Sequence, residues 1–299
     1  MSEPVIQCSH LTHYYGKRKI YEDLNFEVQA GKILGLLGKN GTGKTTTINI
    51  LMGYLKPTAG QCSIYGEPVQ QLSAATRSRI ALLLEGHVQY SFMNVEQIER
   101  YYAPFYPRWN RDAYYELVRK LKIAPRQRIA TMSNGQRSQV ALGLIMAQNA
   151  DMMVLDDFSL GLDPGYRRLF VDYLRDYALA EGKTVFLTSH IIQDMERLVD
   201  DCIVMDYGRI ITHMGVEQLI NTFHRYTFDT DCQRLFDGSY AADSNIFHPE
   251  KMHRHAELYS FLNRQDMEAW LTANGVEHSG LKQDKLTLED AFIGLTGKY

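Results

Sequence analysis

Residues 32–55, KILGLLGKNGTGKTTTINILMGYL, place an apolar segment, a glycine-rich turn and a helical pattern in direct succession. The apolar segment at 33–37 has the length of a buried strand, and apolar residues return at helical spacing over 48–52. The turn between them, residues 38–45, satisfies the pattern G-x-x-x-x-G-K-[ST]. A strand, a phosphate loop and a helix in this order predict a nucleoside triphosphate site on an α/β fold.

The residue types of this loop suit a polyphosphate. Glycines allow the backbone N–H groups to turn inward around phosphate oxygens, and the following helix adds the positive end of its dipole. Lys44 is expected to place its charge on the β- and γ-phosphates, and the hydroxyl of Thr45 to ligate Mg²⁺. Thr46 is placed to donate to the α-phosphate. The nucleotide-binding residues predicted here are Gly38, Asn40, Gly41, Gly43, Lys44, Thr45 and Thr46.

Three further apolar runs lie at 151–157 (DMMVLDD), 183–190 (KTVFLTSH) and 200–210 (DDCIVMDYGRI). They are rich in valine, isoleucine and leucine, which is typical of parallel strands covered on both faces. Helical patterns separate them. The predicted fold class is therefore α/β, with a P-loop NTPase core built on a mainly parallel sheet.

Two regions depart from this alternation. Residues 87–150 contain helical patterns without a convincing strand, which predicts a helical subdomain inserted into the core. Residues 223–299 are polar and loop-rich, and their histidines at 248, 253 and 255 lack the spacing of a zinc site. We expect a nucleotide-binding domain at 1–222 and a small C-terminal α+β accessory domain at 223–299.

Composition narrows the classes of function. Lys and Arg number 32 against 35 Asp and Glu, so no excess of positive charge favours binding to nucleic acid. The four cysteines form no Cys-x-x-Cys pair, which favours reduced thiols in the cytoplasm. No stretch approaches the roughly 18 apolar residues of a spanning helix, and the N-terminus is too polar for a signal peptide. Any membrane that matters to this chain is expected to be crossed by other subunits.

Three more segments decide which kind of nucleotide-binding protein this is. They are TMSNGQRSQVAL at 131–142, VLDDFSLGLDP at 154–164 and LTSH at 187–190. Their order and spacing resemble those of ATP-binding cassette (ABC) proteins over about residues 5–222. Residues 132–136, Met-Ser-Asn-Gly-Gln, stand where that family usually has Leu-Ser-Gly-Gly-Gln.

The resemblance implies a site shared between two cassettes. Ser133 is expected to cap a helix whose free N–H groups attract an anion. In the family this helix end, here with Gly135 and Gln136, faces the γ-phosphate held by the P-loop of a second cassette. Asp163 is expected to bridge to the opposing P-loop. Asn134 replaces a glycine but tolerates a left-handed backbone, so we expect tuning of the site.

The two acids at the end of the 151–157 run are given different roles by the resemblance. Asp156 matches the Walker B aspartate that holds Mg²⁺ and its waters. Asp157 stands where the family usually has a glutamate as general base, and aspartate is shorter by roughly 1.5 Å. Since a misplacement of about 1 Å costs on the order of 100-fold in rate, two hypotheses follow. Either Asp157 hydrolyses ATP slowly, or the site is degenerate and a partner cassette does most of the turnover.

The usual Q-loop glutamine is also replaced. Glu85 occupies its place, as a predicted catalytic residue and Mg²⁺ ligand, and Gln89 is an alternative. In the family this loop lines the groove that receives a membrane subunit. Residues 90–93, YSFM, are a candidate apolar wall of that groove, or else they pack inside the domain.

Two contacts to the nucleotide remain. Tyr15, directly before Gly16, is expected to stack on the adenine, with Tyr14 as the alternative. His190, at the end of LTSH, is expected to contact the γ-phosphate as a catalytic residue.

The chain is one cassette, and its segments FYPRWNRDAYYELVRKLKI at 105–123 and LTLEDAFIGLTGK at 286–298 resemble the exporter branch with separate membrane subunits. The leading hypothesis is an ATPase subunit, with Mg²⁺ and ATP, that lies peripherally on the cytoplasmic face of the cell membrane. Its expected partners are a second cassette, in a homodimer or heterodimer, and integral membrane permease subunits. The alternatives are a soluble ABC ATPase of translation or DNA repair, and a regulatory cassette with little hydrolysis.

Overall fold

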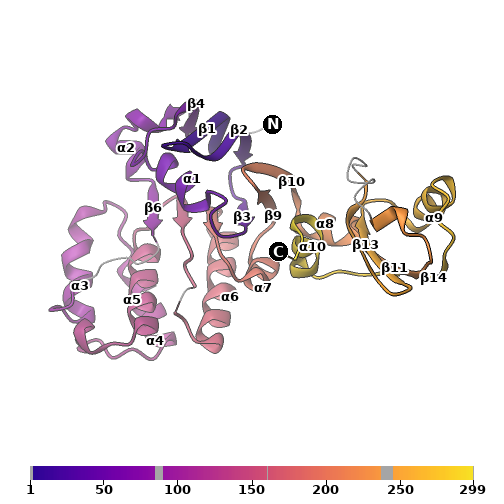
Figure 1. Ribbon diagram of the computed structural model, residues 1–299. Coiled ribbons are helices and arrows are strands. Elements are labelled where there is room, and N and C mark those ends of the chain that lie inside the picture. Colours follow the sequence, from indigo (N-terminus) through magenta and orange to yellow (C-terminus); the bar gives the residue numbers. More distant parts are fainter. Residues whose placement is uncertain (1–2, 85–89, 160, 237–244, 299) are drawn as a thin grey trace. The chain divides into compact units, whose positions relative to one another are not determined.

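The computed structural model describes residues 3–84, 90–159, 161–236 and 245–298 (Figure 1). The chain divides into two compact units, and the division falls between Ile210 and Ile211. None of the helices in these described ranges is long and apolar enough to cross a bilayer.

The first unit is built on two sheets, and one edge strand, β10, extends past the division at Ile210. One is antiparallel, in the order β2-β1-β4-β5, and the other has the order β10-β9-β3-β8-β7-β6. Their strands are β1 (Ile6–Tyr15), β2 (Arg18–Val28), β4 (Ala59–Ile64) and β5 (Glu67–Pro68) in the first sheet, and β3 (Ile33–Gly38), β6 (Ile80–Leu83), β7 (Met152–Leu155), β8 (Thr184–Thr188), β9 (Asp201–Asp206) and β10 (Arg209–Gly215) in the second.

The second sheet confirms the predicted α/β class. β6, β7, β8, β3 and β9 pair in parallel with their neighbours. Every residue of β7 and of β8 is buried, which explains why these strands are continuous apolar runs rather than alternating ones. Because the strands are parallel, the residues that follow β3, β7 and β8 lie at the same edge of the sheet.

Helices connect these strands, and their starts follow the capping residues. α3 begins after Asn94 and α5 after Ser133, each with a complete capping box, and α6 begins with a proline at its first position. The helices of the first unit are α1 (Lys44–Leu51), α2 (Ala74–Arg77), α3 (Val95–Tyr102), α4 (Arg111–Lys120), α5 (Asn134–Ala147), α6 (Pro164–Ala180) and α7 (Ile192–Leu198), with 3₁₀ turns at Val69–Gln71, Ala103–Phe105 and Ile129–Thr131. Helices α3 to α5 lie within the range where a helical subdomain was expected (Figure 1).

The second unit has an antiparallel sheet in the order β12-β13-β11-β14. One face of this sheet packs against α9 through Tyr226, Phe228, Leu258, Met267 and Leu271. Its elements are α8 (Val216–Thr222), β11 (His224–Asp229), a 3₁₀ turn at Arg234–Phe236, β12 (Phe247–Met252), β13 (His255–Ser260), α9 (Arg264–Ala273), β14 (Ser279–Asp284) and α10 (Leu288–Thr296). The C-terminal part is therefore an α+β module.

Two details of this unit bear on the expectations from sequence. α8 contacts α10, so α8 is grouped with the second unit, whereas a boundary at 222 assigns it to the first.

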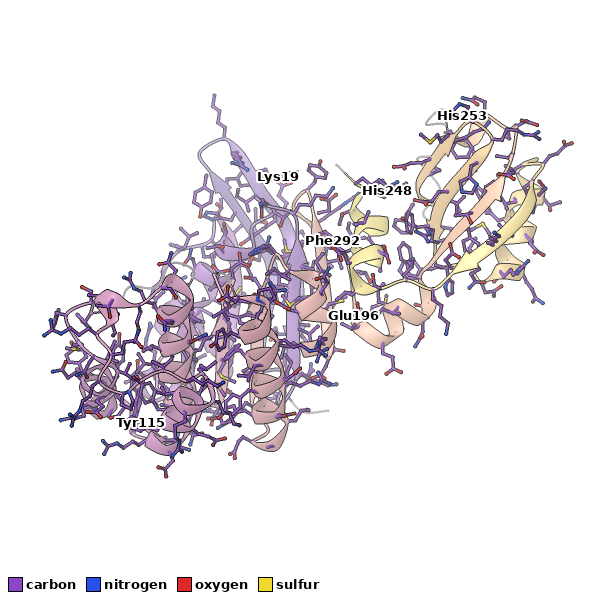
Figure 2. The ribbon with its side chains drawn as sticks, turned by 90° about the horizontal axis from the view of Figure 1, so that it is seen from below. Lys19, Tyr115, Glu196, His248, His253 and Phe292 are labelled. Atoms are coloured by element: carbon purple, nitrogen blue, oxygen red, sulfur yellow. The ribbon has the colours of Figure 1, made fainter. Side chains whose placement is uncertain are left out.

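The three histidines at 248, 253 and 255 lie at different places. Figure 2 shows His253 at the turn between β12 and β13, and His248 beside α10. The third histidine, His255, lies 3.3 Å from a carboxylate oxygen of Asp229.

Candidate functional site

The phosphate loop joins the end of β3 to the start of α1, as its sequence predicts. Gly41 and Gly43 have φ values of 82° and 102°, in the left-handed region that favours glycine. A Cβ on Gly43 would lie 2.6 Å from Cγ2 of Ile20 and 2.8 Å from the Tyr21 ring. The β2 strand thus packs directly on the loop, and only glycine permits this approach.

The loop holds its lysine in place. Lys44 is buried, and its Nζ donates to the carbonyl oxygens of Gly38 at 2.7 Å and Lys39 at 3.2 Å. Thr45 lies exposed on the first turn of α1, whereas Thr46 is buried. The ammonium group and the Thr45 hydroxyl are therefore both at the N-terminal end of α1, where the helix dipole favours an anion.

Asp156 follows β7 directly and is 2% exposed. Its Oδ1 accepts a hydrogen bond from Oγ1 of Thr188 at 2.6 Å. Its Oδ2 is buried, and no donor among the residues that the structure describes reaches it. A buried carboxylate oxygen without a donor is costly, so this atom suits a cation better than a protein donor.

Asp157 lies in a different environment. Its carboxylate accepts a hydrogen bond from the backbone N–H of His190 at 3.0 Å, and Nδ1 of that histidine lies 2.8 Å from the same oxygen. Since a carboxylate only accepts, Nδ1 carries the proton in this pair, and Nε2 is the ring nitrogen left to meet a substrate. The structure thus brings together two residues that are 33 positions apart in the chain.

The start of α5 is capped by Ser133, as its sequence predicts. Oγ of Ser133 accepts from the N–H of Gln136 at 3.2 Å, and the Gln136 side chain accepts from the N–H of Ser133 at 3.2 Å. A Cβ on Gly135 would lie 2.7 Å from the carbonyl oxygen of Gly161. The helix end therefore packs closely on the loop that follows the two acids.

That loop leads to Asp163, which directly precedes α6 in extended conformation. Its side chain makes no capping hydrogen bond, and the residue is exposed. The carboxylate is thus presented to solvent and is not used to start its own helix.

The two tyrosines near the β1–β2 turn, Tyr14 and Tyr15, make different contacts. The hydroxyl of Tyr14 donates to a carboxylate oxygen of Glu22, and this bond raises the pKa of Tyr14. Tyr15 is 50% exposed, and its ring meets the edge of buried His13 at a centroid distance of 4.8 Å. Burial lowers the pKa of His13, so the supporting ring is neutral at pH 7. Of the two tyrosines, Tyr15 therefore has an exposed ring that packs against a buried side chain.

A pocket of about 480 Å³ lies beside the phosphate loop. Arg18, which pairs with Tyr15 across the β1–β2 turn, lines it together with Tyr207. A Cβ on Gly41 would lie 3.2 Å from Nη2 of Arg18, so the guanidinium borders the loop.

Sequence reasoning missed Arg18 and Thr188. The available signals were the position of Arg18 opposite Tyr15 in a hairpin, and a hydroxyl residue that ends an apolar strand.

The predicted Q-loop residues Glu85 and Gln89 lie outside the described residues. The segment that follows them is described, and Tyr90 and Phe92 in it are exposed. The Tyr90 ring lies 5.0 Å from that of Tyr101, which in turn lies 5.6 Å from that of Phe105. Packing inside the domain therefore does not account for Tyr90 and Phe92.

Comparisons with known proteins agree with this arrangement. A family described as ABC transporter matches residues 21–159. The Nod factor export ATP-binding protein I of Burkholderia lata is 32% identical over 307 residues, covering 95% of this chain and 94% of that protein. The bacitracin transport ATP-binding protein BcrA of Bacillus licheniformis is 26% identical over 301 residues, covering 98% of this chain and 97% of that protein.

Solved structures give the same result for the fold. An ATP binding subunit of an ABC transporter is similar with a TM-score of 0.64 and 25% identity, over 73% of this chain and 92% of that one. A bacterial Atm1-family ABC exporter with ATP bound has a TM-score of 0.63 at 19% identity, over 74% of this chain and 40% of that one.

Proposed function

Because the chain belongs to the ABC transporter family of ATP-binding proteins, we propose that it powers a membrane exporter by hydrolysing ATP between two cassettes. The chain is an ABC ATPase subunit, and relatives that match nearly its whole length are named for Nod factor export and bacitracin transport. These relatives favour an exporter subunit over a soluble ATPase of translation or DNA repair. The observation that carries the hydrolytic role is the meeting of the phosphate loop, Asp156 and the Asp157–His190 pair at one edge of the sheet.

The residues present fit Mg²⁺. Asp156 follows β7 and has a buried oxygen that no donor among the described residues reaches, and Thr45 lies exposed on the first turn of α1. Hydroxyl and carboxylate oxygens are the ligands that Mg²⁺ takes in P-loop proteins. When bound there, the ion would neutralise negative charge on the phosphates. Glu85 remains a predicted third ligand.

We propose that Asp157 is the residue that accepts a proton from the attacking water. The hydrogen bonds from His190 orient its carboxylate and hold it within reach of the same sheet edge. Lys44 and the N-terminus of α1 would hold the phosphates, and Nε2 of His190 would donate to the γ-phosphate when that nitrogen also carries a proton. This arrangement favours slow hydrolysis by Asp157 over a degenerate site.

A second cassette completes the site in this proposal. Ser133 at the capped N-terminus of α5 and Asp163 before α6 are both exposed, and the side chain of Asp163 makes no capping hydrogen bond to its helix. An exposed helix N-terminus attracts an anion, so the phosphates held by a partner's loop are a suitable ligand. The partner is a second copy or a related cassette.

The aromatic patch formed by Tyr90, Phe92, Tyr101 and Phe105 supports a membrane subunit as partner. Phe92 is 73% exposed and Phe105 is 67% exposed, and exposed apolar groups gathered in one place mark interaction sites. Tyr101 belongs to α3, which Figure 1 labels, and Phe105 ends the 3₁₀ turn that follows it. We propose that this patch receives an integral membrane permease subunit, which places the chain on the cytoplasmic face of the cell membrane.

Co-purification from detergent-solubilised membranes tests this role. The wild-type chain is expected to retain an integral membrane protein, and a Phe92→Ser, Phe105→Ser variant to lose it while its ATP binding remains. Leu179→Ser is a matched control, because Leu179 is also an exposed apolar residue but lies on α6. A wild-type chain that co-purifies with ribosomes or DNA and with no membrane protein would contradict the exporter role.

A further inference from the structure

We propose that the hydroxyl of Thr188 is a positioning group that sets both acids of the hydrolytic site. It directs Asp156 toward the metal, and it holds the backbone of Asp157 where the carboxylate meets His190. The inference rests on the proposed Mg²⁺–ATP site.

Thr188 ends β8, a strand that lies between β3 and β7 in the sheet. It is fully buried. On one side it pairs with Leu36 of β3, two residues before the phosphate loop begins. On the other side, Leu187 pairs with Leu155, so Thr188 stands beside the acid that follows β7. Its hydroxyl is therefore between the strand of the phosphate loop and the strand of the acids.

Both hydrogen-bonding functions of this hydroxyl are used on the acids. It donates to Oδ1 of Asp156 at 2.6 Å, and it accepts from the backbone N–H of Asp157 at 3.2 Å. A hydrogen bond donated to a carboxylate is charge-assisted and strong. This bond therefore fixes Oδ1 of Asp156 against β8. With Oδ1 engaged, Oδ2 is the oxygen left for the cation, because no donor in the described part of the chain reaches it.

The second bond acts on the backbone of Asp157. This residue has a φ of 45°, in the left-handed region that costs energy for any residue with a Cβ. The hydrogen bond from its N–H to Thr188 stabilises that conformation, and in it the carboxylate meets His190. An aspartate has one methylene fewer than glutamate with which to correct its position, so its reach depends more on the backbone.

A comparison of two threonines in β8 tests the proposal. Thr188→Val removes the hydroxyl and keeps the branched shape, and Thr188→Ser keeps the hydroxyl. Thr184→Val is the matched control, because Thr184 is also buried in β8, and its hydroxyl accepts a hydrogen bond from the N–H of Gly31 at the other end of the strand. All variants are first compared by thermal unfolding of the full-length chain.

The readout is the Mg²⁺ dependence of nucleotide binding, followed by fluorescence of a labelled ATP analogue with and without EDTA. We expect Thr188→Val to raise the Mg²⁺ concentration for half-maximal effect by about ten-fold or more, the value of a lost hydrogen bond to a charged group. Binding in EDTA should stay near that of wild type. Thr188→Ser should keep the Mg²⁺ dependence and the kcat of the wild type, because it keeps the hydroxyl. Thr184→Val should lower only the unfolding temperature.

Equal Mg²⁺ dependence in Thr188→Val and Thr184→Val would overturn the inference while leaving the proposed function intact. A wild-type chain whose nucleotide binding does not respond to Mg²⁺ would overturn both. If Thr188→Val does not fold, Thr188→Cys carries the same expectation, because a thiol is a weak donor of similar size.

Discussion

At the scale of the residue, Asp156 and Asp157 are neighbours in the chain that meet different surroundings. Asp156 is buried and keeps one oxygen without a donor among the described residues. Asp157 is more accessible and is held by His190. The first environment suits a metal ligand and the second suits a group that exchanges protons with water, because burial and hydrogen bonding decide what a carboxylate can do.

Substitution of Asp157 separates base catalysis from a degenerate site. Asp157→Asn is expected to lower kcat by about 100-fold or more, because the amide cannot accept the proton of water. Its KM for ATP should change little, since the phosphate loop is untouched. Asp157→Glu should retain activity. Steady-state ATPase assays with Mg²⁺ measure this, and a rate unaffected by either substitution would show that Asp157 is not the base.

Substitution of the two tyrosines identifies the adenine platform. Tyr15→Ala is expected to weaken ATP binding by about 1–3 kcal/mol, the usual value of base stacking on an aromatic ring. Tyr15→Phe should bind as wild type, because stacking needs the ring and not the hydroxyl. Tyr14→Phe is the control, since it removes only the bond to Glu22. Fluorescence titration with a labelled nucleotide measures the affinities, and wild-type affinity in Tyr15→Ala would rule this ring out.

At the scale of the element, the site depends on how closely α5 meets the loop between β7 and α6. The capping box of Ser133 fixes where α5 begins, and Gly135 lets the helix approach the carbonyl of Gly161. Loss of the cap alone costs about 1 kcal/mol of helix stability. A change in the approach itself moves the loop that carries Asp163.

Gly135→Ala tests that approach. Its Cβ would lie 2.7 Å from the Gly161 carbonyl, so the helix end and the loop must separate. We expect the ATPase rate to fall by about ten-fold or more, because a shift of about 1 Å in a catalytic group is costly. Gly165→Ala is the control, since a Cβ there meets nothing within 4 Å. Equal rates in the two variants would mean that this contact does not position the site.

At the scale of the whole molecule, one chain supplies both a phosphate loop and a capped helix N-terminus that is exposed at Ser133. Ser133 and Asp163 are both exposed. A site assembled from two chains accounts for this exposure, because each copy would then contribute the loop to one ATP and the helix end to the other. In this arrangement the interface and the active site are the same surface.

Mixing two inactive variants tests the shared site. Lys44→Ala removes the phosphate contact, and Ser133→Arg blocks the helix end, so each variant alone should be inactive. In a mixed dimer one site carries both defects and the other carries none. For a two-fold homodimer with random pairing, about a quarter of the wild-type ATPase rate is expected. A mixture that stays inactive would argue against a homodimer with composite sites.

Much of the site was predictable because its residues are close in sequence or belong to contiguous motifs. The phosphate loop from Gly38 to Thr45 and the cap at Ser133 are local structures, and their residue types specify them. Thr188 was not predictable in its role, because its partners lie more than thirty residues away. The difference in environment between Tyr14 and Tyr15 depends on Glu22, which lies on the neighbouring strand.

The amino-acid sequence by itself determined the α/β class, the phosphate loop, the capped helix and the presence of two adjacent acids, because each follows from short-range geometry and from the period of apolar residues. Only the tertiary structure decided which groups surround those acids. The parallel pairing of β7 with β8 placed Thr188 and His190 beside them, and it left one oxygen of Asp156 buried without a donor among the described residues. Such roles depend on which donors reach a carboxylate across strands, and that is a property of the packed sheet.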